Sequence, residues 1–145
     1  ETLLASSKTF IEKSERSKGI RFVASFEELH YFVVVHRIQD KASTAMASVV
    51  EKFNLRFYKS KKLETSNLIF NDQHVLTFVG MLSNKSEALE YFNRFNDQVA
   101  NGPPFSTLNF HNFVITKDNF NIFYRNKALD EYLSFFDRHY QKENQ

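Results

Sequence analysis

The sequence predicts a single α+β domain, because strand-like runs alternate with amphipathic helical patterns over most of its 145 residues. The composition agrees with this prediction. Hydrophobic residues make up 42% and aromatic residues 16%, including 17 Phe, so the chain can bury a sizeable core. Only 3 Gly and 2 Pro are present, which favours regular elements joined by short connections.

The N-terminal stretch has the pattern of a short amphipathic helix. Leu3, Leu4, Phe10 and Ile11 recur at helical spacing, and the expected helix ends before Gly19. A short extended segment follows it. We therefore expect residues 1–29 to form a helix and a linker that join the domain to a region upstream of the first residue.

The next part of the chain has the pattern strand, helix, strand, strand. Residues 30–37 (HYFVVVHR) are apolar on both faces, which is typical of a central strand. Asp40 offers a helix N-cap, and residues 42–57 carry apolar side chains at spacings of three and four. Residues 63–70 are more polar and indicate an edge strand. Residues 75–82 (VLTFVGML) indicate a second central strand.

A second helix and a fourth strand follow. Asn84 and Glu87 have the spacing of a capping box, which marks the start of a helix. Asn101-Gly102-Pro103-Pro104 ends that helix. Residues 108–116 (LNFHNFVIT) then indicate a fourth strand.

The order of these elements predicts a ferredoxin-like βαββαβ antiparallel sheet with an N-terminal helix and two C-terminal helices. The two C-terminal helices are expected at residues 118–124 and 128–140. They are natural candidates to cover the sheet face that the other two helices leave open. The domain would then span residues 30–140, followed by a polar tail at 141–145.

Charge and composition weigh against several classes of function. With 19 Lys and Arg against 17 Asp and Glu, the formal charge is +2, without the basic excess that nucleic-acid binding usually requires. The absence of Cys excludes disulfides, thiol catalysis and thiolate metal sites. No apolar run approaches the roughly 18 residues that span a bilayer.

The residues also suggest no catalytic or metal site. The five His form no HExxH pattern, although His36 and His111 lie in strands expected to be adjacent and would form a two-His site if their registers coincided. Structural histidines are the better interpretation. GxSxG, SxxK and Walker patterns are absent. We therefore predict a non-enzymatic domain with no catalytic residues, no metal and no cofactor.

Two aromatic patterns have alternative interpretations. Residues 77–82 resemble an RNA-contacting strand motif, with residues 110–115 as its second aromatic motif, but alternating aromatics are more often core. Phe135 lies beside the helical stripe of its segment. It either widens the buried face or is an exposed partner contact, and it is our candidate contact residue.

A family resemblance covers residues 30–140. The order of HYFVVVHR, EKFN, LIF, FVGMLSNKSEALEYFNRF and FVITKDNFNIFYRNKALDEYLSFFDRHY resembles the C-terminal domain of the PorW/SprE family. These are tetratricopeptide-repeat lipoproteins of the type IX secretion and gliding-motility machinery of Bacteroidota. The resemblance implies a protein–protein interaction domain at the periplasmic face of the outer membrane, with other secretion or motility proteins as partners. It also implies helical repeats and a lipid-bearing Cys upstream, so that only this anchor would contact the membrane.

A second resemblance gives an alternative function. SPOR domains, which bind peptidoglycan that lacks stem peptides, share the duplicated βαββαβ layout. FVGMLSNKSEALEYFNRF resembles their second half-repeat. The C-terminal helices depart from that pattern and would cover a sheet face that a glycan needs. Peptidoglycan binding is therefore the alternative, and RNA binding is a third, weaker one.

Overall fold

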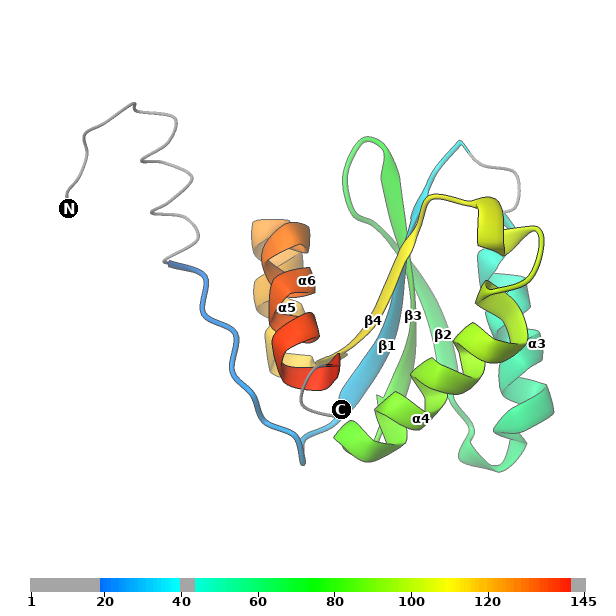
Figure 1. Ribbon diagram of the computed structural model, residues 1–145, viewed down its shortest axis with the longest axis horizontal. Coiled ribbons are helices and arrows are strands. Elements are labelled where there is room, and N and C mark those ends of the chain that lie inside the picture. Colours follow the sequence, from blue (N-terminus) through cyan, green and yellow to red (C-terminus); the bar gives the residue numbers. More distant parts are fainter. Residues whose placement is uncertain (1–18, 40–43, 142–145) are drawn as a thin grey trace.

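The computed structural model describes residues 19–39 and 44–141 (Figure 1). The expected helix before Gly19, the Asp40 N-cap and the tail at 142–145 lie outside the described residues. The strands are β1 (His30–Arg37), β2 (Glu64–Ile69), β3 (His74–Leu82) and β4 (His111–Thr116), and the helices are α3 (Met46–Phe57), α4 (Lys85–Phe95), α5 (Lys117–Asn126) and α6 (Leu129–Phe136). The predicted α+β class is confirmed, and the described residues form one four-stranded antiparallel sheet with four helices.

The four strands form one antiparallel sheet in the order β2-β3-β1-β4. The two strands predicted to be central, β1 and β3, occupy the middle, and the more polar β2 lies at an edge, as expected. β1 is buried along its length because it packs on both faces. Phe32, Val33, Val34 and Val35 are fully buried.

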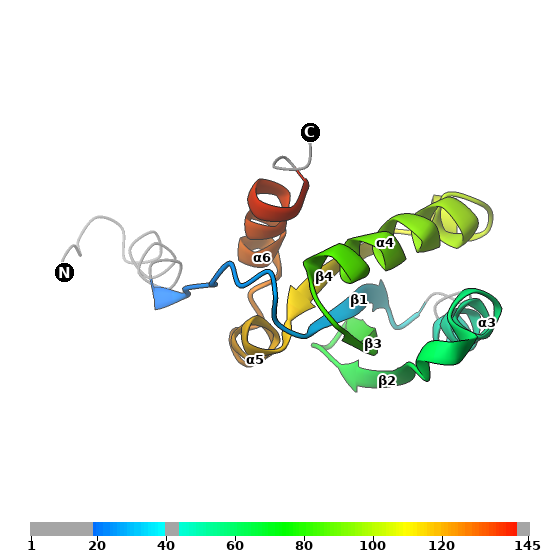
Figure 2. The same cartoon turned by 90° about the horizontal axis from the view of Figure 1, so that it is seen from below.

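The two sheet faces are covered by different helices (Figure 2). On one face, the ring of Phe32 lies 4.9 Å from Tyr91 and 5.0 Å from Phe95 of α4. On the other face, Phe120 of α5 lies 5.1 Å from Tyr31 of β1. The C-terminal helix α5 therefore packs against this second face.

The start of α4 has the predicted N-cap at Asn84, while the Glu87 side chain bonds one residue earlier than in a regular capping box. Asn84 Oδ1 accepts a hydrogen bond from the backbone N–H of Glu87 at 2.9 Å, and the Glu87 carboxylate accepts one from the N–H of Ser83. Lys61 forms an ion pair with Glu87, with Nζ and Oε2 2.7 Å apart. The hydrogen bond from Lys61 holds the pKa of Glu87 below its usual value. This pair ties the turn between α3 and β2 to α4.

The segment before β1 is packed against the C-terminal helices. The ring of Phe22 lies 5.0 Å from Tyr132, and the ring of Phe26 lies 5.6 Å from Tyr140. The buried Asn119 accepts a hydrogen bond from the N–H of Val23 and donates one to its carbonyl. The part of the expected linker that the structure describes therefore contributes to the core.

Candidate interaction surface

The two edges of the sheet differ. At the β4 edge, α6 lies alongside the strand, and its buried Tyr132 donates a hydrogen bond from its hydroxyl to the carbonyl of Val114 at 2.6 Å. The ring of Tyr132 also lies 5.0 Å from Phe113 of β4. This helix thus satisfies and covers backbone that an edge strand would otherwise expose.

The β2 edge, residues 64–69, is open by contrast. Every residue of β2 except Thr65 is exposed. Ile69 is 69% exposed, and Leu55 on the neighbouring helix α3 is 66% exposed. Together with Leu68, these residues place exposed aliphatic side chains along one side of the molecule, where they are available to a partner.

The hydrogen bonds of the hairpin show which backbone groups of β2 point outward. The N–H of Phe70 donates to the carbonyl of His74 at 2.9 Å, which marks a hydrogen-bonded pair of the antiparallel ladder. Such pairs alternate, so the backbone groups of Thr65, Asn67 and Ile69 point away from β3. The outward carbonyl of Ile69 accepts a hydrogen bond from the Tyr124 hydroxyl at 2.8 Å. Thr65 and Asn67 therefore keep both their N–H and C=O groups open, and Ile69 keeps its N–H.

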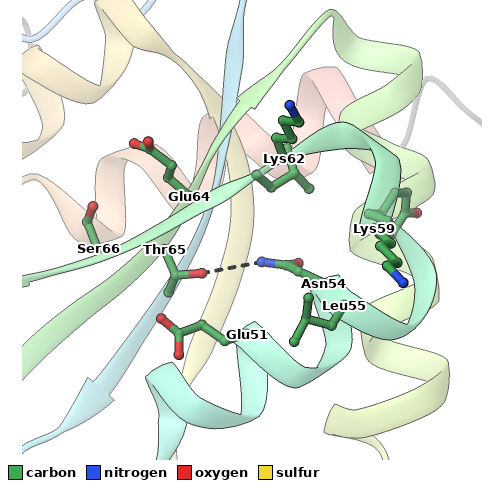
Figure 3. Close-up of a pocket in the computed structure, with 10 residues that line it drawn as sticks. Glu51, Asn54, Leu55, Lys59, Lys62, Glu64, Thr65 and Ser66 are labelled. Atoms are coloured by element: carbon green, nitrogen blue, oxygen red, sulfur yellow. Dashed lines mark hydrogen bonds between the residues drawn. The ribbon is translucent and has the colours of Figure 1, made fainter.

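A hollow of about 510 Å³ lies between β2 and α3, and we call it the α3 hollow (Figure 3). Its apolar lining includes Leu55 and Leu63, and a hydrogen bond of 3.3 Å from Asn54 Nδ2 to Thr65 Oγ1 joins the helix to the strand. The full lining is Glu51, Asn54, Leu55, Tyr58, Lys59, Lys62, Leu63, Glu64, Thr65 and Ser66. The hollow is therefore bounded by the same strand whose backbone is open.

A smaller hollow of about 320 Å³ lies on the opposite face of β2, and we call it the β3 hollow. The half-buried rings of Tyr31 and Phe78 line it together with Glu64 and Ser66. Ser66 pairs with Phe78 across the sheet, so the two side chains share this face, whereas Thr65 faces α3. The β2 edge thus has a hollow on each side.

The charges around the α3 hollow are separated. Lys59 and Lys62 lie near the turn into β2, with Glu64 at the start of that strand, and Glu51 lies across the hollow on α3 (Figure 3). Neither lysine forms an ion pair with a described residue, whereas the neighbouring Lys61 is paired with Glu87. One end of the hollow therefore offers two ammonium groups to an anionic side chain.

Two tyrosines behind the α3 hollow differ in how their hydroxyls are satisfied. The Tyr91 hydroxyl donates a hydrogen bond to Asn54 Oδ1, whereas the buried Tyr58 hydroxyl has no hydrogen-bond partner among the described residues. Their ring centroids lie 5.1 Å apart. Burial raises the pKa of both phenols, so both are neutral.

Tyr58→Phe is expected to leave stability unchanged or raise the free energy of unfolding by about 1 kcal/mol, because it removes an unsatisfied buried hydroxyl. Tyr91→Phe is the matched comparison. It is expected to lower the free energy of unfolding by about 1–3 kcal/mol, because the buried Asn54 carbonyl loses its donor. Urea unfolding of both variants measures the difference, and equal losses would contradict this assignment.

The residues singled out in the sequence do not gather into one site. Phe135 is 5% exposed, with its ring 5.6 Å from Phe22 and 5.5 Å from Tyr132, so it widens the buried face and is not an exposed contact. His111 pairs with Val35, so it lies on the sheet face opposite to His36, and the two-His site does not form. The described residues hold no cluster of three potential metal ligands.

Two of the histidines are buried and hydrogen-bonded, which agrees with a structural role. His36 Nε2 lies 2.7 Å from Thr77 Oγ1. His30 lies with Nδ1 2.7 Å from the carbonyl of Glu28 and with Nε2 2.8 Å from the Tyr140 hydroxyl. The pKa of His30 is lowered mainly by burial and further by the charge of Lys85, against the opposing effect of the Glu28 carbonyl.

The stability of the protein is expected to fall as the pH drops below about 6.5, because the unfolded chain binds a proton at His30 that the folded protein resists. His30→Gln should remove part of this dependence. The pKa of His74 is also lowered, mainly by burial, so part of the slope should remain in that variant. Urea unfolding between pH 5 and pH 8 (about the range in which His titrates) measures both proteins, and identical slopes would contradict the assignment to His30.

No family model, no curated protein and no solved structure matches this chain. Within the part of the chain that the structure describes, no helix is both long and apolar enough to cross a membrane. The open β2 edge and the hollows beside it are therefore the features from which a function is inferred.

Proposed function

We propose that this chain is a non-enzymatic protein–protein interaction domain that binds its partner at the β2 edge. The observation that supports it most directly is the difference between the two sheet edges. α6 covers β4, whereas the backbone groups of Thr65 and Asn67 in β2 are open beside exposed Leu55 and Ile69. Folded proteins normally protect such an edge, so an open one beside a hollow favours a binding surface.

The strand itself carries few of the usual protective features. β2 contains no Pro, its register with β3 runs without a bulge, and its one charged residue is Glu64 at the start. The half of the strand from Ser66 to Ile69 is uncharged. Charge, Pro and bulges are the devices that prevent strands from pairing at an edge. Their absence here supports a role in binding.

The same proposal includes the ferredoxin-like arrangement and the family context. The element order and the strand order β2-β3-β1-β4 support the arrangement. The resemblance of residues 30–140 supports a place in the type IX secretion or gliding-motility complex, at the periplasmic face of the outer membrane. The anchor would lie in the upstream region, and the partners would be other proteins of that complex.

Co-purification from the native envelope tests this function. The full-length protein is expected to recover secretion or motility components, and Ile69→Glu should reduce that recovery because it places a charge on the β2 edge. Val23→Glu is the matched control, since Val23 is 59% exposed at another place on the surface. Recovery of no secretion or motility component would overturn the proposed context.

Peptidoglycan binding is the second candidate, favoured by the β3 hollow. Rings of Tyr31 and Phe78 beside the polar Glu64 and Ser66 suit a sugar, although Phe120 of α5 packs against both rings and narrows the accessible face. Sedimentation with purified peptidoglycan sacculi separates the two candidates. The interaction function predicts that the chain stays in the supernatant.

A further inference from the structure

The proposed function leaves open what kind of segment binds at the β2 edge. Building on that function, we propose that an extended segment of a partner protein adds to β2 as a fifth strand. It places an apolar side chain in the α3 hollow and an acidic residue beside Lys59 and Lys62. Backbone, shape and charge each point to such a segment.

The backbone of β2 provides the ladder. The N–H and C=O groups of Thr65 and Asn67 point away from β3, and the two residues are separated by one position, which is the repeat of an antiparallel or parallel ladder. The Tyr124 hydroxyl already occupies the carbonyl of Ile69, so the ladder ends before that residue. A short extended segment therefore fits the open stretch.

The two hollows provide the side-chain sites. Successive side chains of a strand point to opposite faces of the sheet, and an added strand lies about 4.8 Å from its neighbour. One residue of the segment would point into the α3 hollow, against Leu55 and Leu63, and the next toward the β3 hollow near Ser66. A helix docked at this edge would not use both hollows, which is why an extended segment is favoured.

The charges around the α3 hollow indicate where the acidic residue of the segment lies. Lys59 and Lys62 line one end of the α3 hollow without a carboxylate partner among the described residues. An Asp or Glu in the segment would lie against these ammonium groups and away from Glu51, which lies across the hollow on α3. Such charge complementarity fixes orientation and speeds association.

A second copy of this chain is a poorer occupant of the β2 edge. Pairing of β2 with itself by twofold symmetry would bring the Ile69 end of each strand to the Glu64 end of the other. The Tyr124 hydroxyl is already bonded at the Ile69 end of β2, whereas the α3 hollow lies at the Glu64 end. The surface is thus asymmetric along the strand, which favours a different protein.

The first test uses a displayed library of random ten-residue peptides (about the length of a strand) selected on the 145-residue chain. Selected peptides are expected to share an apolar residue and an acidic residue at fixed spacing. Asn67→Pro should weaken their binding about tenfold or more, because it removes an outward N–H that the peptide backbone needs. Asn67→Ala is the matched control. It also loses the 2.8 Å bond from Thr77 to the Asn67 side chain, but it keeps the N–H and should bind normally.

The second test exchanges charge without touching the ladder. Lys59→Glu/Lys62→Glu should weaken binding of the selected peptides about tenfold and should remove most of its salt dependence. Lys117→Glu/Arg125→Glu on α5 makes the same change in net charge at exposed positions away from the hollow and should bind as the unchanged chain does. If Asn67→Pro fails to fold, this pair of variants decides the question alone.

Three results would overturn the inference. They are a helical consensus among selected peptides, equal binding by Asn67→Pro and Asn67→Ala, and a dimer in sedimentation that Asn67→Pro abolishes. A failure here is distinct from a failure of the proposed function. If envelope partners are recovered but Asn67→Pro does not reduce their recovery, the interaction function stands and strand addition is wrong.

Discussion

Phe113→Ala is expected to lower the free energy of unfolding by about 3–5 kcal/mol. Phe113 of β4 is fully buried, and its ring lies 5.4 Å from Phe123 of α5 and 5.0 Å from Tyr132 of α6. Its side chain therefore fills the space where both C-terminal helices meet the sheet. Its removal leaves a cavity between the sheet and both helices. Movement of one helix into this cavity would break its packing against the other. Urea unfolding followed by circular dichroism measures the loss.

Phe78→Ala provides the comparison, because Phe78 is only half-buried. Its ring packs against the rings of Tyr31 and Phe120. We expect a smaller loss of about 1–3 kcal/mol. These two aromatics are the ones that an RNA-binding function would require on the surface. If Phe113→Ala abolished RNA binding and left the free energy of unfolding unchanged, RNA binding would be favoured and the assignment of Phe113 to the core would be wrong.

The central strands could be predicted because their own residues indicate their environment. β1 and β3 are covered on both faces, so both sets of alternating side chains must be apolar, and such a run is visible without any partner. The start of α4 was predictable for a similar reason. Asn84 and Glu87 satisfy backbone groups within their own turn, so the signal is local.

The ends of other elements were less well predicted. The fourth strand begins at His111, not at residue 108, because Phe105–Thr107 form a turn of 3-10 helix that delays it. The last helix was expected over 128–140. α6 ends at Phe136, and a wider helical turn continues it over Asp137–Gln141. The hydrophobic pattern continues across both kinds of turn, so it does not locate the change.

Contacts between distant segments could not be read from the pattern. Phe135 lies off the stripe of its helix and is nevertheless buried, because Phe22 from the segment before β1 packs against it. The α3 hollow likewise depends on the distance between segments that are separate in the sequence. The polar character of β2 indicates an edge, but the space beside Leu55 depends on how far α3 stands from that strand. Only the three-dimensional arrangement gives that distance.

The covering of the β4 edge leads to the second large prediction. Tyr132→Ala is expected to lower the free energy of unfolding by about 3–5 kcal/mol, because the ring is fully buried between Phe113 and Phe22. Tyr132→Phe keeps the ring and should cost about 1–3 kcal/mol, since the hydrogen bond to the Val114 carbonyl and the interaction with the Tyr140 hydroxyl are lost.

The two Tyr132 variants also separate packing from edge protection. If α6 shields β4 from pairing with other chains, Tyr132→Ala should aggregate through new intermolecular strands at concentrations where Tyr132→Phe stays monomeric. Light scattering and the β-sheet signal in circular dichroism would both rise. Phe113→Ala, with a comparable expected loss of stability, is the control, because it leaves the hydrogen bond from α6 to Val114 in place. Equal aggregation of the two alanine variants would mean that instability alone exposes the chain. Aggregation confined to Tyr132→Ala would show that α6 keeps this edge closed, so that β2 is the edge left for a partner.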